Sequence, residues 1–136
     1  MVVKLRRVIF LMLRFDQIQM DTIYTSEASK NFLVQLKRNT GIQTWNVLCR
    51  LAFCHSLKDQ SLPRNIDEAL NGVEMNYDTF AGIHKGLYLG LLIQNLVKNK
   101  VEINKNNLNK YLRAHIGRGI YILFNKKLRN LKQFME

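Results

Sequence analysis

Apolar residues recur at helical spacing in the segment from about residue 25 to residue 41. Four of them share one side: Ala28, Phe32, Leu33 and Leu36. Three basic residues fall largely off that stripe: Lys30, Lys37 and Arg38. Because residues three and four apart share a face of an α-helix, this pattern predicts an amphipathic helix. Thr25 or Ser26 suits its N-cap, and Gly41 suits the left-handed position that ends a helix.

A second helix is predicted from its cap at Thr44 to about Leu57, and its apolar face is wide enough for a central position. That face holds Val47, Leu48, Leu51, Ala52 and Cys54 or His55. A third predicted helix, from about His84 to Val97, is apolar nearly all round and carries Gly86 and Gly90 on one face. Each helical glycine costs about 1 kcal/mol relative to alanine, so we expect another helix to approach closely there, in the core or in an oligomer.

The remaining segments are less regular. Residues 18–24 read as a short strand or extended arm, and residues 58–78 as an acidic loop with Pro63 and Gly72. A final helical region is predicted from about Asn106 to Phe134, broken in two by a turn at Gly117 and Gly119. The predicted fold class is therefore mainly α, a compact single domain over residues 21–136 that assembles as a homo-oligomer.

The N-terminal residues 1–20 are predicted as a separate basic and apolar extension. Their opening, MVVKLRRVIFLMLR, imitates a secretory signal, but the apolar run is short and no small-residue cleavage site follows. A bilayer-spanning helix needs about 20 apolar residues, more than this run supplies. A β-strand, a surface amphipathic segment and an upstream extension of the true start all remain open.

The chain carries a large excess of positive charge. The 136 residues include 21 Lys+Arg and 10 Asp+Glu, a formal net charge of +11. Such a field attracts nucleic acid, an anionic membrane surface or an acidic protein, and charge alone does not choose among them. The excess is too large for simple surface solvation, so we predict phosphate contacts by basic residues off the apolar stripes. These include Lys30, Lys37, Arg38, Lys126, Lys127, Arg129 and Lys132.

Residues that carry chemistry elsewhere are better explained here as structure. Cys49 and Cys54 lie five apart, about 140° around a helix, which predicts two unbridged thiols and a reducing compartment. The three histidines lack the spacing of a metal site or the partners of a nucleophile, so no cofactor and no metal is expected. No phosphate-binding loop motif is present. Trp45 is expected to pack in the core rather than to stack on a base.

Arg118 stands between two glycines, and two roles are open for it. A tight turn with a structural arginine is favoured, while the alternative presents the guanidinium to a phosphate or to another subunit.

Residues 33–57, LVQLKRNTGIQTWNVLCRLAFCHSL, resemble the signature of the DndE family, in which Leu-Lys, Thr-Gly-Ile and Arg-hydrophobic-Ala-Phe-Cys occur in this order. Residues 73–94 are similar to that family's Glu-hydrophobic-Asn segment, and HIGRGI at 115–120 to its His-x-x-Arg-Gly motif. The resemblance covers about Asp21 to Leu123. The N-terminal lead and the tail after Leu123 fall outside it.

The resemblance implies the smallest subunit of the bacterial DNA phosphorothioation system, a helical cytoplasmic protein that forms a homotetramer and binds duplex DNA, nicked DNA preferentially. It further implies that sulfur chemistry belongs to partners, among them a PAPS-reductase-like iron–sulfur protein, a cysteine desulfurase and an SMC-like ATPase. DNA contacts are expected from Lys30, Lys37, Arg38, Arg118, Lys126 and Lys127, and packing of subunits from Gly41, Gly86 and Gly90. The rival classes are a small basic ribonuclease or toxin and a protein of anionic membranes.

Overall fold

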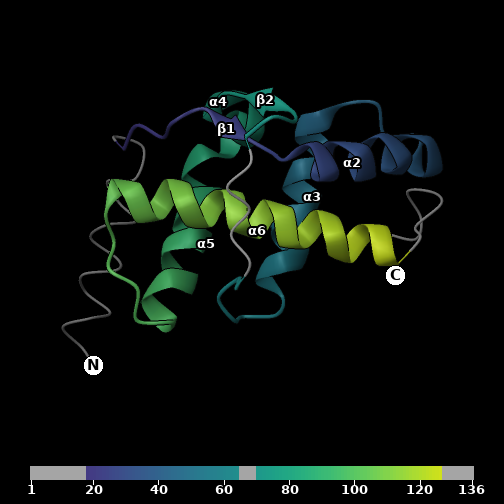
Figure 1. The fold of residues 1–136 in the computed structure, drawn as a ribbon. Coiled ribbons are helices and arrows are strands. Elements are labelled where there is room, and N and C mark those ends of the chain that lie inside the picture. The colour runs from purple at the N-terminus through teal and green to yellow at the C-terminus, as the bar shows by residue number, and fades with distance from the viewer. Residues whose placement is uncertain (1–17, 65–69, 127–136) are drawn as a thin grey trace.

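The computed structural model describes residues 18–64 and 70–126. The long helices are α2 (Glu27–Thr40), α3 (Trp45–Leu57), α5 (Lys85–Lys98) and α6 (Lys105–Asn125). The shorter elements are β1 (Ile23–Tyr24), β2 (Glu74–Met75), α4 (Tyr77–Ala81) and the 3-10 turn η2 (Gly82–His84). The mainly α prediction, with a short strand near the N-terminus, is confirmed (Figure 1). The homo-oligomer stays a prediction. Two predicted segments lie outside the described residues: residues 1–17 of the N-terminal extension, and the helical stretch that was predicted to continue beyond Lys126. Lys127 belongs to the second of them.

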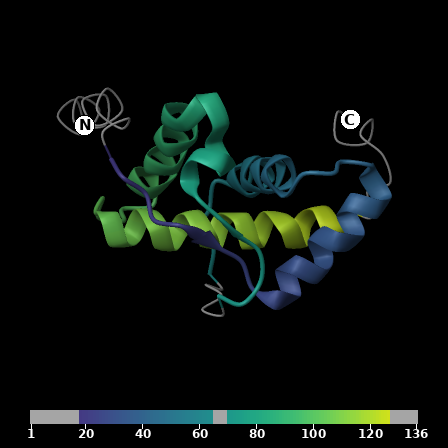
Figure 2. The ribbon, with the colours of Figure 1, turned by 90° about the horizontal axis from the view of Figure 1, so that it is seen from above.

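Helix α6 crosses the middle of the molecule, with α3 and α5 packed on one side of it and α2 lying along its C-terminal half (Figures 1 and 2). The contact between α3 and α6 is the most extensive in the fold. Its buried side chains, each 2% exposed or less, include Leu48, Ala52, Phe53, Leu112, Ile116 and Ile120. The central position predicted for the second helix is therefore confirmed. Its predicted face is only partly right: Leu48 and Ala52 are buried, but Val47, Leu51, Cys54 and His55 are half-buried, and the rest of the buried face is Cys49, Phe53 and Ser56.

The predicted break at Gly117 and Gly119 is wrong, because α6 runs through both glycines without interruption. Gly119 is buried where α6 crosses α3, and a Cβ at this position would lie 1.7 Å from the carbonyl oxygen of Ala52. A hydrogen is the only substituent that this crossing accommodates. The glycine therefore marks a close helix contact rather than a turn. Close approach was predicted instead for Gly86 and Gly90 in α5, of which Gly90 is buried and Gly86 half-buried.

The ends of α2 form as its local sequence predicts. Ser26 caps the start, its Oγ accepting a hydrogen bond from the amide of Ser29 at 3.0 Å. Gly41 ends the helix with φ 77°, and its N–H donates to the carbonyl of Lys37 at 3.0 Å. The buried face differs from the prediction, since Ala28 is exposed, Phe32 is half-buried and Thr40 is buried.

The two short strands join distant parts of the chain. They pair antiparallel, with Ile23 opposite Met75 and Tyr24 opposite Glu74. The pairing continues beyond β1, where the amide of Gly72 donates to the carbonyl of Thr25 at 2.8 Å. The strand predicted over residues 18–24 is thus limited to two residues, and part of the predicted 58–78 loop is the second strand. This pairing fixes the position at which α2 begins.

Candidate nucleic-acid interface

The basic residues predicted on α2 lie on its outer side. Lys30 and Arg38 are exposed and Lys37 is half-buried. Lys30 and Lys37 are seven positions apart, which places them on one line of the helix about 10 Å apart. Figure 2 shows α2 along one edge of the molecule, so a large partner has access to this side. We call Lys30, Lys37 and Arg38 the α2 basic face.

Lys37 is positioned by an aromatic contact at the corner between α2 and α3. Its ammonium nitrogen lies 3.5 Å from the ring centroid of Trp45, in the first turn of α3. A cation over an indole face is stabilised by the ring quadrupole. Trp45 is half-buried and packs against the core, which confirms the structural role predicted for it. The ring face under Lys37 is therefore occupied within the chain.

The acidic side chains that form ion pairs do so elsewhere. Among the described residues, three ion pairs occur: Lys85–Asp78 at 2.9 Å, Lys105–Asp21 at 3.3 Å and Arg118–Asp59 at 3.9 Å. None involves the α2 basic face. Over residues 18–64 and 70–126, the positive charge of α2 is therefore not neutralised by a paired carboxylate.

Stacked aromatic rings bring the end of α6 beside α2. Phe32 of α2 and Phe124 of α6 are stacked with ring centroids 4.3 Å apart. Lys126, the C-cap residue of α6, is exposed and lies two positions after Phe124. The fold thus places this basic residue at the end of the molecule where α2 and α6 pack together.

Arg118 is bound within its own chain. Its side chain is 19% exposed, and three of its nitrogens donate hydrogen bonds to α3 and the segment after it. Nε donates to Ser56 Oγ at 2.8 Å, Nη1 to Ser61 Oγ at 2.9 Å, and Nη2 to the carbonyls of Ser56 and Ser61 at 2.8 and 2.9 Å. These hydrogen bonds agree with the structural role that we favoured for Arg118, although the turn predicted around it is a continuous helix. A phosphate contact by Arg118 stays a prediction that these hydrogen bonds do not favour.

His115 is fully buried and forms the centre of the same network. Its Nδ1 lies 2.8 Å from Ser56 Oγ, and its Nε2 lies 2.8 Å from Asn95 Oδ1. Asn95 Nδ2 donates to the carbonyl of Gln60 at 3.1 Å, so Asn95 Oδ1 faces the ring as an acceptor. His115 therefore carries its proton on Nε2, while Nδ1 accepts from the Ser56 hydroxyl.

Two consequences follow for chemistry. Burial, together with the positive charge of Arg118, lowers the pKa of His115 to about 4, so the ring is neutral at pH 7. With no exposed surface and both nitrogens bonded, it cannot exchange protons with a substrate. Burial also raises the pKa of the Cys49 thiol to about 12. The core thiol is Cys49, whereas His55 of the same helix is only half-buried, and the imidazole in the core is that of His115. Both cysteines are unbridged.

The described part of the chain lacks two further features. Residues 18–64 and 70–126 contain no group of three side chains of the metal-binding types placed to hold an ion. The same residues contain no helix with the length and hydropathy needed to cross a bilayer.

These features define a small, mainly helical protein with a basic helix face and a hydrogen-bonded polar network buried in its core. The family model of DNA sulphur modification protein DndE matches residues 22–130, and the chain belongs to this family. The resemblance found in the sequence is thereby confirmed. Proteins of this family take part in the DNA phosphorothioation system.

Solved structures agree with this assignment. A crystal structure of DndE from Escherichia coli B7A, described as involved in DNA phosphorothioation modification, is 26% identical with a TM-score of 0.62, over 78% of this chain and 98% of that one. A DndE mutant with glycines replaced by lysine is 23% identical with a TM-score of 0.63, over 78% of this chain and 99% of that one, and shows the same fold. The search of curated proteins found no match.

Proposed function

We propose that this chain is a non-catalytic DNA-binding subunit of a DNA phosphorothioation complex, working in the cytoplasm as a homotetramer. The α2 basic face carries the proposal, because three cations on an accessible helix have no paired carboxylate among the described residues. Family membership supplies the biological setting. The PAPS-reductase-like and SMC-like ATPase proteins of the system are the proposed partners that perform the chemistry.

The binding mechanism is electrostatic. Lysine and arginine side chains replace the counterions that duplex DNA condenses around its phosphates, and the released ions drive association. Contacts to phosphates do not distinguish one base sequence from another, so selectivity among intact duplexes of different sequence is weak. A nick makes the duplex easier to bend, which lowers the deformation cost of fitting a rigid basic surface. Several copies of the α2 basic face in one assembly contact more phosphates than one subunit reaches.

The proposed assembly uses glycine-containing surfaces. Gly41 is exposed, and a Cβ added there would meet no atom within 4 Å, so the corner between α2 and α3 presents bare backbone to a second copy. Gly86 and Gly90 lie on α5, where the half-buried Gly86 is the more accessible of the two. We propose that copies of the chain pack at these positions.

A gel-shift salt titration with intact and nicked duplexes of one sequence tests the proposal. We expect log Kd to rise linearly with log salt, with a slope near 0.9 for each phosphate contacted, and tighter binding of the nicked duplex. Changing Lys30, Lys37 and Arg38 together to glutamate should weaken both complexes by at least about a hundredfold and lower the salt slope. Light scattering on the same samples measures the assembly.

The matched control changes Lys58, Lys100 and Lys110 to glutamate, which alters net charge equally away from the α2 basic face. If both triple variants weaken binding to the same extent, the effect is one of net charge and the assigned face is wrong. Cleaved DNA in the gel would support the nuclease rival instead. Liposome binding lost on deletion of residues 1–14, with no DNA binding, would support the membrane rival.

A further inference from the structure

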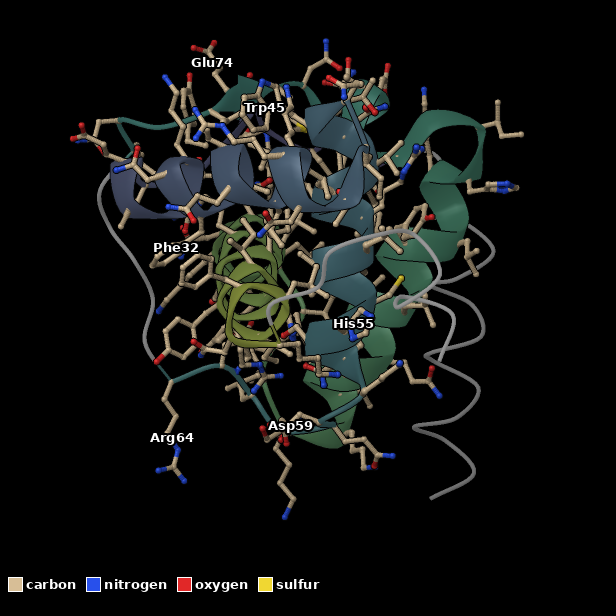
Figure 3. The ribbon with its side chains drawn as sticks, turned by 90° about the vertical axis from the view of Figure 1, so that its right-hand side faces the viewer. Phe32, Trp45, His55, Asp59, Arg64 and Glu74 are labelled. Carbon is tan, nitrogen blue, oxygen red and sulfur yellow. The ribbon has the colours of Figure 1, made fainter. Side chains whose placement is uncertain are left out.

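A second basic feature lies between α2, α6 and the segment Ser61–Arg64. It is a groove of about 810 Å³, within the range of about 300–1,000 Å³ that small-molecule sites occupy. Figure 3 views α6 along its axis and shows Phe32 and Arg64 on the same side of that helix, with Arg64 extending outward. The α2 basic face does not line this groove. We call it the α2–α6 groove.

The groove is electrostatically suited to an anion. Among the described residues, three arginines line it, Arg64, Arg113 and Arg118, against one carboxylate, Asp59. Asp59 lies 3.9 Å from Arg118, whose donors are already used by Ser56 and Ser61, so these two charges offset each other. Among the described residues, no carboxylate pairs with Arg113 or Arg64. Arg113 is half-buried, which strengthens its attraction for an anion relative to a fully hydrated side chain.

The opposite end of the groove is aromatic. Tyr121 is 57% exposed, and its ring meets Phe32 edge-on with centroids 6.4 Å apart. Phe32 is stacked on Phe124, so one of its own faces is already covered. The Tyr121 ring is therefore the accessible aromatic surface. An exposed aromatic side chain inside a hollow is a platform on which a flat ring can stack.

One line along α6 joins the two ends. Arg113, Gly117 and Tyr121 follow one another at intervals of four residues, so they share one face of the helix. A Cβ at Gly117 would meet no atom within 4 Å, which leaves open space between the cationic and the aromatic end. The hydroxyl-bearing residues Ser29 and Ser61 line the sides and add hydrogen-bonding groups. The arrangement fits a ligand with negative charge at one end and a flat ring at the other.

We propose that the α2–α6 groove binds a single nucleotide, with the phosphate on Arg113, the charge of Arg64 at the rim, and the base stacked on Tyr121. Bases inside an intact duplex are already stacked on their neighbours and do not reach such a surface. The nucleotide is therefore either a free one or one unit of an unpaired strand. The site is separate from the α2 basic face, and its occupation does not depend on duplex binding.

Isothermal titration of the full-length protein with 2′-deoxyadenosine monophosphate tests the site. We expect binding that is at least about tenfold weaker for deoxyadenosine and for inorganic phosphate, because each lacks one half of the recognised ligand. Arg113→Ala should weaken nucleotide binding about tenfold or more, and Tyr121→Ala about fivefold or more. Tyr121→Phe should bind like the wild type, because the stacking ring is kept.

Lys30→Ala is the charge-matched control and should leave nucleotide binding unchanged while weakening the duplex complex. A short deoxyadenosine oligonucleotide that binds with the same dependence on Arg113 and Tyr121 identifies an unpaired strand as the source. Binding of the mononucleotide alone identifies a free nucleotide. The proposal is overturned if the wild type binds no nucleotide, or if Arg113→Ala and Tyr121→Ala, folded by circular dichroism, bind as the wild type does. Neither result affects the duplex titration.

Discussion

Gly119 of α6 and Ala52 of α3 meet with no room for a side chain between them. A Cβ on Gly119 would lie 1.7 Å from the Ala52 carbonyl oxygen, whereas one on Gly117, two positions earlier, would meet nothing within 4 Å. Gly119 is thus tightly packed against a neighbouring helix, whereas Gly117 has open space beside it. This relationship sets the distance between the two helices whose mutual contact is the most extensive in the fold.

Replacing each glycine with alanine should change stability in opposite directions. Gly117→Ala removes a flexible residue from a helix interior and should raise the free energy of unfolding by about 1 kcal/mol. Gly119→Ala forces α3 and α6 apart and should lower it by about 3 kcal/mol or more. Urea unfolding followed by circular dichroism measures both. Equal effects of the two changes would show that the crossing is not as tight as the structure has it.

Stability should fall as the pH is lowered from 7 to 5, because of His115. Its pKa is lowered from 6.5 to about 4 in the folded protein, so the unfolded chain binds a proton more readily. The contribution of neutral His115 to the free energy of unfolding is therefore fully present above pH 6.5 and is lost progressively as the pH falls from 6.5 to 4. Integrated to pH 5, the loss from this residue is about 2 kcal/mol.

Urea unfolding at a series of pH values tests this assignment, and His115→Gln provides the comparison. That variant should be less stable at pH 7, since the bonds to Ser56 and Asn95 are disturbed. Its stability should change much less between pH 7 and 5. If wild type and variant lose stability in parallel, another group is responsible for the pH dependence.

The two cysteines should differ in reactivity toward a thiol reagent at pH 8. Cys49 is fully buried with its pKa raised to about 12 by that burial, so almost no thiolate is present. Cys54 is half-buried, and burial raises its pKa while the nearby Lys58 opposes the rise. We expect one thiol per chain to be modified in the native protein and both in urea. Peptide mass mapping identifies the modified residue, and modification of Cys49 under native conditions would contradict the predicted order.

Two substitutions of Gly41 should distinguish an effect on backbone strain from an effect on assembly. At φ 77° any L-residue is strained, so Gly41→Ala and Gly41→Lys should each lower the free energy of unfolding by about 1 kcal/mol. Only the lysine variant projects a long charged side chain from the corner where we propose that copies pack. Light scattering should therefore show a smaller assembly for Gly41→Lys and an unchanged one for Gly41→Ala. An unaltered mass for the lysine variant would remove Gly41 from the proposed interface.

Features that depend on neighbours in the chain could be predicted from the sequence. Ser26 and Gly41 delimit α2 because capping involves backbone groups three or four residues away. The apolar stripe identified Leu33 and Leu36 as buried, and Lys30 and Arg38 beside it as exposed. The Thr-Gly-Ile and Arg-hydrophobic-Ala-Phe-Cys segments carried the family resemblance, which the match over residues 22–130 confirmed.

Features that depend on distant partners required the fold. Gly119 was interpreted as a turn because nothing in its own segment indicates that Ala52 faces it across a helix crossing. The sequence did not indicate that Ser56 and Ser61 bind Arg118, because the two serines lie 62 and 57 positions away from it. The α2–α6 groove is likewise formed by three segments that meet only in space.

The sequence by itself therefore determined the extents of α2, α3 and α5, the two caps of α2, the family and the excess of positive charge, because each depends on local spacing or on composition. The tertiary structure decided which glycine contacts a neighbouring helix, which arginine is bound internally, and where Tyr121 and Arg113 line one groove. Those properties are set by distances between residues far apart in the chain, and such distances exist only once the chain has packed.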